Sequence, residues 1–316
     1  MREGKAKGSE LVIYPDGTLY HIDLKRADNI PPNIFLVGAA ERADSFAKAF
    51  DSVSFRHRNS ARPEFYTVAG FYKNAPMAVI STGIGPDNTE IVMNELHALF
   101  EYDHQKSEWT NVLPRVNIIR VGTCGASLKE IPAGALAISR YSIGLDNLGV
   151  YYPALNRDAV AEKIEKEFLK TIVGKTNPLS YAAPAYAEVI VALEKSAQDA
   201  GEKAPMLISG ITTASPGFFA PEGRNIGRIK TAFSLEQFVN LIYEFEAEGL
   251  KIINHEMETS ILFRLANEIL GYRAGAICVV VDNLSSDEFI DANFAKERTE
   301  KCISIALEAM ARLAHV

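Results

Sequence analysis

The stretch NIIRVGTCGA (117–126) decides the fold, because it joins a strand-like segment to residues that suit a binding site. Its first half, NIIRV (117–121), is a mostly apolar run without alternation, as expected of a strand covered on both faces. Its second half supplies two glycines and Thr123 where that strand is expected to end. In open α/β sheets, ligands bind beyond the carboxyl ends of the strands. The stretch therefore predicts a central strand that leads directly into a functional site.

Other short apolar runs share this continuous character, and helical patterns lie between several of them. The runs are IFLV (34–37), MAVI (77–80), ALAI (135–138), MLIS (206–209) and AICVVV (276–281). Helices are expected at 86–100, with Asp87 or Asn88 as cap, and at 158–172, 186–200, 235–248, 256–270 and 293–314. This alternation predicts a three-layer α/β/α fold with a central mixed, largely buried sheet.

The chain shows no repeat, low-complexity tract or Pro/Gly linker that would divide it. We therefore expect one domain over residues 1–316, with an N-terminal extension at 1–19. The polar stretch EYDHQKSEWTNVLPR (101–115) is expected to be an excursion before the strand at 117–121.

Composition and charge narrow the class of protein. With 33 basic and 40 acidic residues the net charge is −7, which argues against a nucleic-acid-binding surface. The three cysteines are far apart and form no CxxC pair, which favours a reducing compartment. MREGKAKGSE (1–10) lacks the apolar core of a secretory signal, and the longest apolar run, AGAICVVV (274–281), is too short to cross a membrane. A cytoplasmic protein with no membrane partner is expected.

Glycine-rich segments with nearby arginines follow three of the expected strands. They are GAAERAD (38–44), STGIGPDN (81–88) and VGTCGA (121–126). Backbone N–H groups next to arginine side chains suit a phosphate. None matches the Walker spacing, and STGIGP is only a partial dinucleotide fingerprint. Each segment alone is also compatible with an ordinary turn, and Arg42 with a solvated helix position.

The loop ITTASPGFFAPEGR (211–224) follows the run MLIS and carries two adjacent phenylalanines. Phe218 in a Pro/Gly-rich loop is suited to stacking on a flat heterocycle. Glu222 and Arg224 would then bind the polar edge of that ring. The alternative is a loop that uses its phenylalanines as a hydrophobic anchor.

The stretch NHEMETS (254–260) places Glu256 and Glu258 around a methionine after a histidine. A zinc motif HExxH would need a second histidine at 259, which is threonine, so no metal is expected. Helix capping by Asn254, with acidic residues in the first turn, is the structural alternative. Capping alone leaves His255 and Met257 unexplained.

The order of these motifs resembles that of the nucleoside phosphorylases, and most closely the uridine phosphorylases. The family pattern runs GDPDR, STGIGGPS, RIGTTG, FYPGQER and EMES. The counterparts here are GAAER, STGIGPDN, RVGTCG, FFAPEGR and EMET, in the same order, and the resemblance covers roughly residues 20–285.

The resemblance implies a role for each matching position. The phosphate site comprises Gly38, Arg42, Arg120 and Thr123, with Arg62 from a neighbouring subunit. The ribose site comprises Glu256, Met257 and Glu258, with His21 from a partner chain. The base site comprises Phe218, Glu222 and Arg224, and the residues implied in catalysis are Arg224, Glu258 and Arg120.

The implied reaction is phosphorolysis of uridine to uracil and ribose 1-phosphate, without a cofactor. Phosphate is the co-substrate, and a carboxylate such as Glu258 accepts hydrogen bonds from both ribose hydroxyls. Sites shared between subunits imply a homodimer or hexamer, and some relatives hold a monovalent cation through a glutamate at the position of Glu64. Purine nucleoside phosphorolysis, nucleoside hydrolysis and a non-catalytic nucleoside-binding protein are the alternatives; Arg42 and Arg120 argue against hydrolysis.

Three positions depart from the pattern. Glu222 replaces a glutamine, and a carboxylate cannot donate a hydrogen bond to a uracil oxygen. Ala39 replaces an acidic residue beside the phosphate glycine. Asp282 lies where purine-cleaving relatives keep an aspartate, although we favour a role for it in capping the next turn. Asn283 fits the asparagine of the pyrimidine enzymes, but Leu284 does not fit their arginine.

Overall fold

The computed structural model describes residues 8–110, 113–154 and 157–314. The first seven residues of the expected N-terminal extension, and two residues of the expected excursion at 101–115, lie outside this range. The described part of that excursion contains a small hairpin of β5 (Tyr102–Asp103) and β6 (Glu108–Trp109), and Trp109 stacks on His97.

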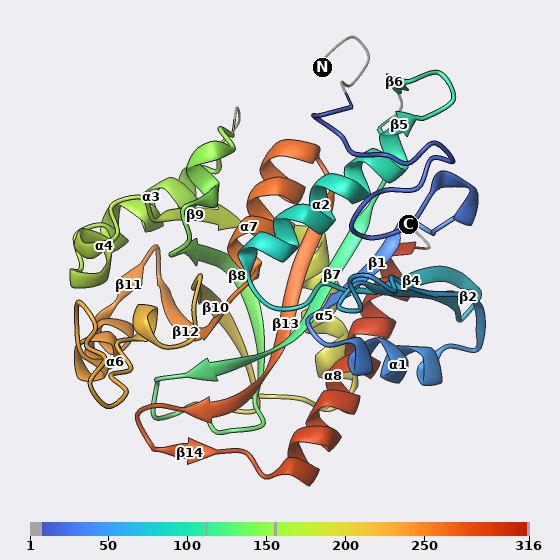
Figure 1. Cartoon of the computed structure of the whole chain (residues 1–316). Coiled ribbons are helices and arrows are strands. Elements are labelled where there is room, and N and C mark those ends of the chain that lie inside the picture. Colours follow the sequence, from blue (N-terminus) through green and yellow to red (C-terminus); the bar gives the residue numbers. More distant parts are fainter. Residues whose placement is uncertain (1–7, 111–112, 155–156, 315–316) are drawn as a thin grey trace.

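A large mixed sheet forms the centre of the protein (Figure 1). Its strands are β1 (Asn33–Val37), β2 (Ser52–Arg58), β3 (Tyr66–Tyr72), β4 (Ala75–Ser81), β7 (Asn117–Ala126), β8 (Leu136–Gly144), β9 (Tyr181–Pro184), β10 (Leu207–Ala214), β11 (Glu246–Ala247), β12 (Leu250–Glu256), β13 (Arg273–Asn283) and β14 (Glu288–Phe289). Their order is β11-β12-β10-β8-β13-β7-β1-β4-β3-β2, with β9 beside β8 and β14 beside β13.

The helices are α1 (Ala40–Ala49), α2 (Pro86–Glu101), α3 (Ala159–Phe168), α4 (Ile172–Thr176), α5 (Ala187–Asp199), α6 (Leu235–Glu244), α7 (Thr259–Phe263) and α8 (Ala292–Ala314). Short 3₁₀ turns are η1 (Arg26–Asp28), η2 (Leu148–Tyr151) and η3 (Ala220–Glu222), and the π-helix η4 (Arg264–Leu270) continues α7. Helices α5 and α8 pack together on β13, while α2 and α7 pack together on the other side of the sheet (Figure 1). The predicted α/β fold with a mixed central sheet is confirmed.

One pairing gives the sheet a shape that the apolar pattern does not reveal. Strand β12 pairs with β10 and also with β7, where His255 lies opposite Gly125. Because β10, β8, β13 and β7 are already neighbours, this pairing closes β12, β10, β8, β13 and β7 into a ring. The ring brings the ends of β7, β12 and β13 close together.

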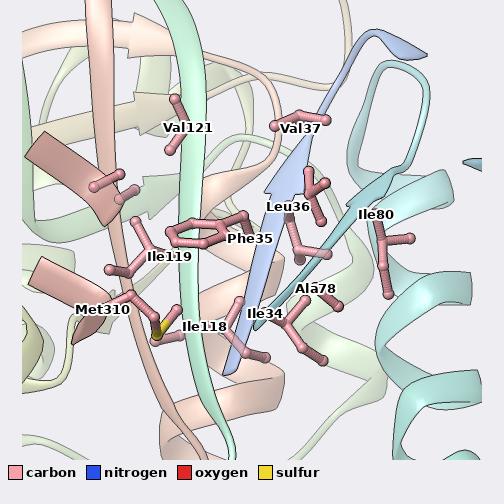
Figure 2. Close-up of a cluster of buried hydrophobic side chains, with 14 of the residues drawn as sticks. Ile34, Phe35, Leu36, Val37, Ala78, Ile80, Ile118, Ile119, Val121 and Met310 are labelled. Carbon is pink, nitrogen blue, oxygen red and sulfur yellow. The ribbon is translucent and has the colours of Figure 1, made fainter. Parts of the chain in front are cut away.

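The parallel strands β1, β4 and β7 form the centre of the hydrophobic core (Figure 2). Ile34, Phe35, Leu36 and Val37 of β1 are all at most 2 % exposed, on both faces of the strand. Ile118 and Ile119 of β7 lie on one side of them, and Met310 of α8 packs nearby. Complete burial of such a side chain contributes about 1.5–3 kcal/mol. The prediction of doubly covered strands from continuous apolar runs is therefore confirmed here.

Several strands extend beyond their apolar runs. Strand β7 continues to Ala126, so VGTCGA belongs to the strand rather than to a loop, and β10 includes the residues ITTA (211–214). Polar side chains remain inside the ring because they bond to one another: Ser139 pairs with Thr212, and Thr212 donates to Asn254. Asn254 is thus a buried strand residue, and the alternative in which it caps a helix is wrong.

Helix boundaries also differ from expectation. Helix α2 begins after Gly85 with Pro86 in its first turn, so the caps expected at Asp87 or Asn88 are wrong. Proline suits that position because its missing N–H would have no partner there. The helix expected over 256–270 starts only at Thr259, the segment 158–172 divides into α3 and α4, and α6 ends at Glu244. Among the described helices, none is long and apolar enough to cross a membrane.

Candidate active site

A cavity of about 500 Å³ opens at the carboxyl ends of β1 and β7, next to the ends of β12 and β13. The structure brings ten of the sequence-predicted site residues to its wall. They are Gly38, Arg42, Arg120, Thr123, Phe218, Glu222, Arg224, Glu256, Met257 and Glu258. Residues more than 200 positions apart in the chain thus meet in one place because the sheet aligns their strand ends.

Two predicted residues, His21 and Arg62, do not line this cavity. Both are hydrogen-bonded to Asn59. The His21 ring pairs with Glu95 at 2.6 Å, and its carbonyl accepts from Asn59. The Arg62 guanidinium stacks 4.1 Å from the ring centre of Tyr20. Asn59 connects the two residues, because its Oδ1 also accepts from the Arg62 backbone N–H at 3.1 Å.

Arg42 and Arg120 are neighbouring arginines in the cavity wall. Arg42 lies in α1, and its Nη1 donates to the Val121 carbonyl at 3.2 Å. Burial, and next the neighbouring Arg120, lower the pKa of Arg42. Because its surroundings destabilise its positive charge, a bound anion would stabilise the Arg42 guanidinium.

Arg120 holds two buried carboxylates at the centre of the cavity. Its Nε donates to Glu256 at 2.9 Å, and its Nη2 forms a short contact with Glu258. Burial alone would lower the pKa of Arg120, but Glu258 and Glu256 outweigh burial and raise it. Arg120 is only 6 % exposed, so this arrangement is screened very little by solvent.

The two glutamates have different surroundings. Glu256, at the end of β12, accepts from the backbone N–H groups of Glu258 and Thr259 at 3.0 and 2.9 Å, so it caps the start of α7. Both of its oxygens are thereby occupied. Glu258 accepts from the Gly85 N–H at 2.7 Å, and burial raises its pKa although Arg120 opposes that shift.

Arg224 holds a second group of side chains in the cavity wall. Its Nε donates to Glu222 at 2.7 Å, its Nη2 donates to Asp282 at 3.2 Å, and its guanidinium lies 4.4 Å from the ring centre of Phe218. Burial raises the pKa of Glu222 to about 7, while Arg224 acts in the opposite direction. Asp282 faces the cavity and Arg224, so its favoured role as a turn cap is corrected.

Sequence reasoning assigned no role to His255, which also lines the cavity. Its side chain is 2 % exposed, and its Nε2 lies 3.7 Å from the nearer Glu222 oxygen. Burial, and next Arg224, lower the pKa of His255 to about 3, so the ring is neutral. Neither ring nitrogen has a hydrogen-bond partner among the described residues. The only available signal was the position of His255 directly before the EMET motif.

Glu64 also lines this cavity, although it was considered only as a ligand for a cation. Within the described residues there is no group of three or more His, Cys, Asp or Glu side chains arranged to hold a metal. A monovalent cation at Glu64 stays a prediction.

Comparison with known proteins gives consistent matches over almost the whole chain. The model of the family described as the phosphorylase superfamily matches residues 33–315. The chain is similar to a uridine phosphorylase of Thermococcus kodakarensis, with 28 % identity covering 95 % of this chain and 88 % of that one. It is also similar to a DeoD-type purine nucleoside phosphorylase of Buchnera aphidicola, with 23 % identity covering 92 % and 98 % of the two chains.

Among solved structures, the chain is similar to a Trypanosoma brucei nucleoside phosphorylase described as showing uridine phosphorylase activity. The TM-score is 0.86 and the sequence identity 29 %, covering 96 % of this chain and 99 % of that one.

Proposed function

The chain belongs to the phosphorylase superfamily, and we propose that this nucleoside phosphorylase splits uridine with inorganic phosphate into uracil and ribose 1-phosphate. The observation that carries the proposal is one cavity whose wall combines Arg42 and Arg120, two glutamates bound to Arg120, and an aromatic ring packed on a third arginine. Such a set of side chains suits inorganic phosphate together with the ribose and the base of a nucleoside.

Phosphate binds at the end formed by Arg42 and Arg120, with Thr123 and the backbone at Gly38 completing its contacts. The planar guanidinium of arginine can donate two parallel hydrogen bonds to phosphate oxygens. A bound phosphate would also raise the lowered pKa of Arg42, because it stabilises the charged form. A phosphate held in position against the sugar carbon removes much of the entropic cost of the reaction, about 7–11 kcal/mol in the most favourable cases.

Ribose binds at the centre, where Glu258 accepts from the two sugar hydroxyls and Met257 supplies an apolar surface. Glu258 is the better candidate because it accepts one hydrogen bond on each oxygen, whereas Glu256 accepts three, two of them on Oε2. Breaking the glycosidic bond gives the sugar positive character, so the nearby carboxylates and phosphate stabilise the transition state.

The base binds at the end formed by Phe218, Glu222 and Arg224. Phe218 stacks on the base, and Arg224 stabilises the negative charge that develops on the oxygens of the departing uracil. The loop that carries all three is η3 with its flanking turns, which places them on one side of the cavity.

Purine nucleoside phosphorolysis is the second candidate, because Asp282 faces the cavity beside Arg224. An aspartate in this position can share a proton with a purine ring nitrogen as the base departs. Similarity to a purine enzyme as well as to uridine enzymes keeps this candidate open.

The deciding experiment is base release from uridine, thymidine, inosine and adenosine, each with and without phosphate. We expect uracil release from uridine only when phosphate is present. Phosphate-dependent release from inosine or adenosine alone would instead assign the base-binding role to Asp282. Release that needs no phosphate would contradict the role of the arginines.

A further inference from the structure

An ionised Glu222 provides no hydrogen-bond donor for the carbonyl of a base, but a neighbouring side chain can provide one. Above its pKa of about 7, Glu222 is ionised and accepts hydrogen bonds but donates none. In that form it alone matches only the N–H of a base and repels the adjacent carbonyl. His255 also lines the cavity, and its Nε2 lies 3.7 Å from the nearer Glu222 oxygen. The pair presents an acceptor and a nitrogen donor side by side.

The position of His255 depends on Gly125 in the facing strand. A Cβ at Gly125 would lie 2.2 Å from His255 Nε2 and 2.6 Å from Asp282 Oδ1. Nε2 therefore fills the space that a larger residue at 125 would take, next to the cavity wall. The Phe238 ring packs edge-to-face on the imidazole, with 5.7 Å between the ring centres, which limits the movement of the imidazole.

The charges around His255 keep it neutral. Arg224, Glu222 and Asp282 are the charged groups near it, and burial together with Arg224 prevents its protonation near neutral pH. A neutral imidazole carries one N–H and one acceptor nitrogen. Both nitrogens are buried, and neither has a partner among the residues that the structure describes, so a ligand that accepts from the Nε2–H removes the cost of leaving it unpaired.

We propose that His255 determines base specificity: its Nε2–H donates to a ring carbonyl while Glu222 accepts from the adjacent ring N–H. The inference rests on the proposed function and names the substrate class of that site, bases with a lactam edge, –NH–C(=O)–. Uracil, thymine and hypoxanthine carry this edge. Cytosine and adenine present an acceptor nitrogen and an amino group instead, so Glu222 faces an acceptor and they are rejected.

The test is equilibrium binding of free uracil, 2-thiouracil, 4-thiouracil and cytosine in the presence of phosphate. The proteins are the wild type, Glu222→Gln, His255→Phe and the double variant. Phenylalanine keeps a flat ring of similar size in the buried site, and thermal melting of each variant reports its folding. Binding needs no turnover, so this outcome is independent of whether uridine is split.

In the wild type, uracil should bind at least about 10-fold more tightly than cytosine and than one of the two thio-analogues, since sulfur is a weak acceptor. His255→Phe should lose about 10-fold in uracil affinity and lose that thio-discrimination. The double variant should regain affinity, because an amide at 222 both accepts and donates. Glu222→Gln should raise uracil affinity much less when His255 is present, and a purely structural role for His255 would not produce this difference between the two backgrounds.

The inference is overturned if His255→Phe binds uracil like the wild type, or if Glu222→Gln fails to rescue it. If His255→Phe does not fold, the wild type decides alone: equal affinity for uracil and both thio-analogues overturns the proposal. Uracil binding with the expected pattern but without uridine cleavage would retain the inference and reject the proposed reaction.

Discussion

Arg120 is the residue that makes two buried carboxylates compatible with a folded protein. It contacts Glu256 and Glu258, and all three side chains are at most 7 % exposed. Removing one partner of such a cluster leaves buried charge unpaired, which usually costs about 3–5 kcal/mol. The same residue therefore has a structural role in the free protein and a proposed role in phosphate binding.

We predict that Arg120→Met lowers the free energy of unfolding by about 3–5 kcal/mol at neutral pH and abolishes activity. Arg42→Met is the matched control, since Arg42 donates to a backbone carbonyl and its own charge is disfavoured by burial. It should lose phosphate affinity with a much smaller effect on urea unfolding. Equal stability losses in the two variants would contradict this division of roles.

Arg224→Ala should reduce turnover and base selectivity while leaving phosphate affinity unchanged. The reason is distance along the cavity: Arg224 contacts Glu222, Asp282 and Phe218, and no residue of the proposed phosphate site. Measuring kcat/KM for each nucleoside, together with phosphate binding by calorimetry, separates the two effects. A variant with unchanged turnover on its best substrate would refute the assignment.

Glu222 should also give the protein a characteristic dependence of stability on pH. Its folded-state pKa of about 7 is above the ordinary value of 4.5. The folded state therefore holds this proton more tightly, and the stabilisation present below pH 4.5 is lost as pH rises through 7. The limit is about 3 kcal/mol. Relative to Glu222→Gln, the melting temperature of the wild type should fall between pH 5 and pH 7.5; parallel curves would show that Glu222 titrates normally.

At the scale of an element, the turn after η3 sets the positions of Glu222 and Arg224. Gly223 between them has φ = +72°, and a Cβ there would lie 2.4 Å from the Ser234 carbonyl carbon. Gly227 in the same loop has φ = +57° but no atom within 4 Å of its Cβ position. An alanine at 227 therefore tests backbone strain alone, whereas an alanine at 223 tests backbone strain together with a steric conflict.

Gly227→Ala should cost only the strain of a left-handed conformation, about 1–2 kcal/mol, and retain activity. Gly223→Ala adds a conflict with the backbone at Ser234, the residue that caps α6, so it should lose more stability and most of kcat/KM. Thermal melting and steady-state kinetics measure both. Wild-type activity in Gly223→Ala would show that the base site tolerates movement of this turn.

At the scale of the whole molecule, His21 and Arg62 remain outside the cavity of their own chain. We propose that they complete the site of a second copy in at least a dimer. In a two-fold assembly, each site then combines residues from both chains. Light scattering should detect a dimer or larger species, and an active monomer would contradict this arrangement.

Subunit complementation tests the same proposal more sharply. Arg62→Ala and Glu258→Ala should each be inactive alone. After dissociation and mixing, one site of each mixed dimer has both residues intact, so part of the activity should return. Mixing Arg120→Met with Glu258→Ala is the control, because Arg120 and Glu258 line the same cavity. If that control complements equally well, the sites are not shared as proposed.

The sequence by itself determined the α/β class, the buried strands β1, β4, β7 and β13, and ten residues that meet at one cavity. The strands depend on local properties, because apolar runs have the same chemistry wherever the chain places them. The ten residues were identified through the order of motifs that resembles the nucleoside phosphorylases. Strands whose apolar signal is interrupted, such as β12, escaped prediction because buried polar residues like Asn254 find their partners on other strands.

Only the tertiary structure decided which side chains face each other. The pairing of β12 with β7 places His255 opposite Gly125, and the contact of Arg224 with Asp282 joins residues 58 positions apart. The tertiary structure also gave the two glutamates different roles: Glu256 caps α7, whereas Glu258 is better placed for a ligand. Such contacts depend on strand register and ring closure, which arise from the packing of distant segments and leave no trace in local sequence.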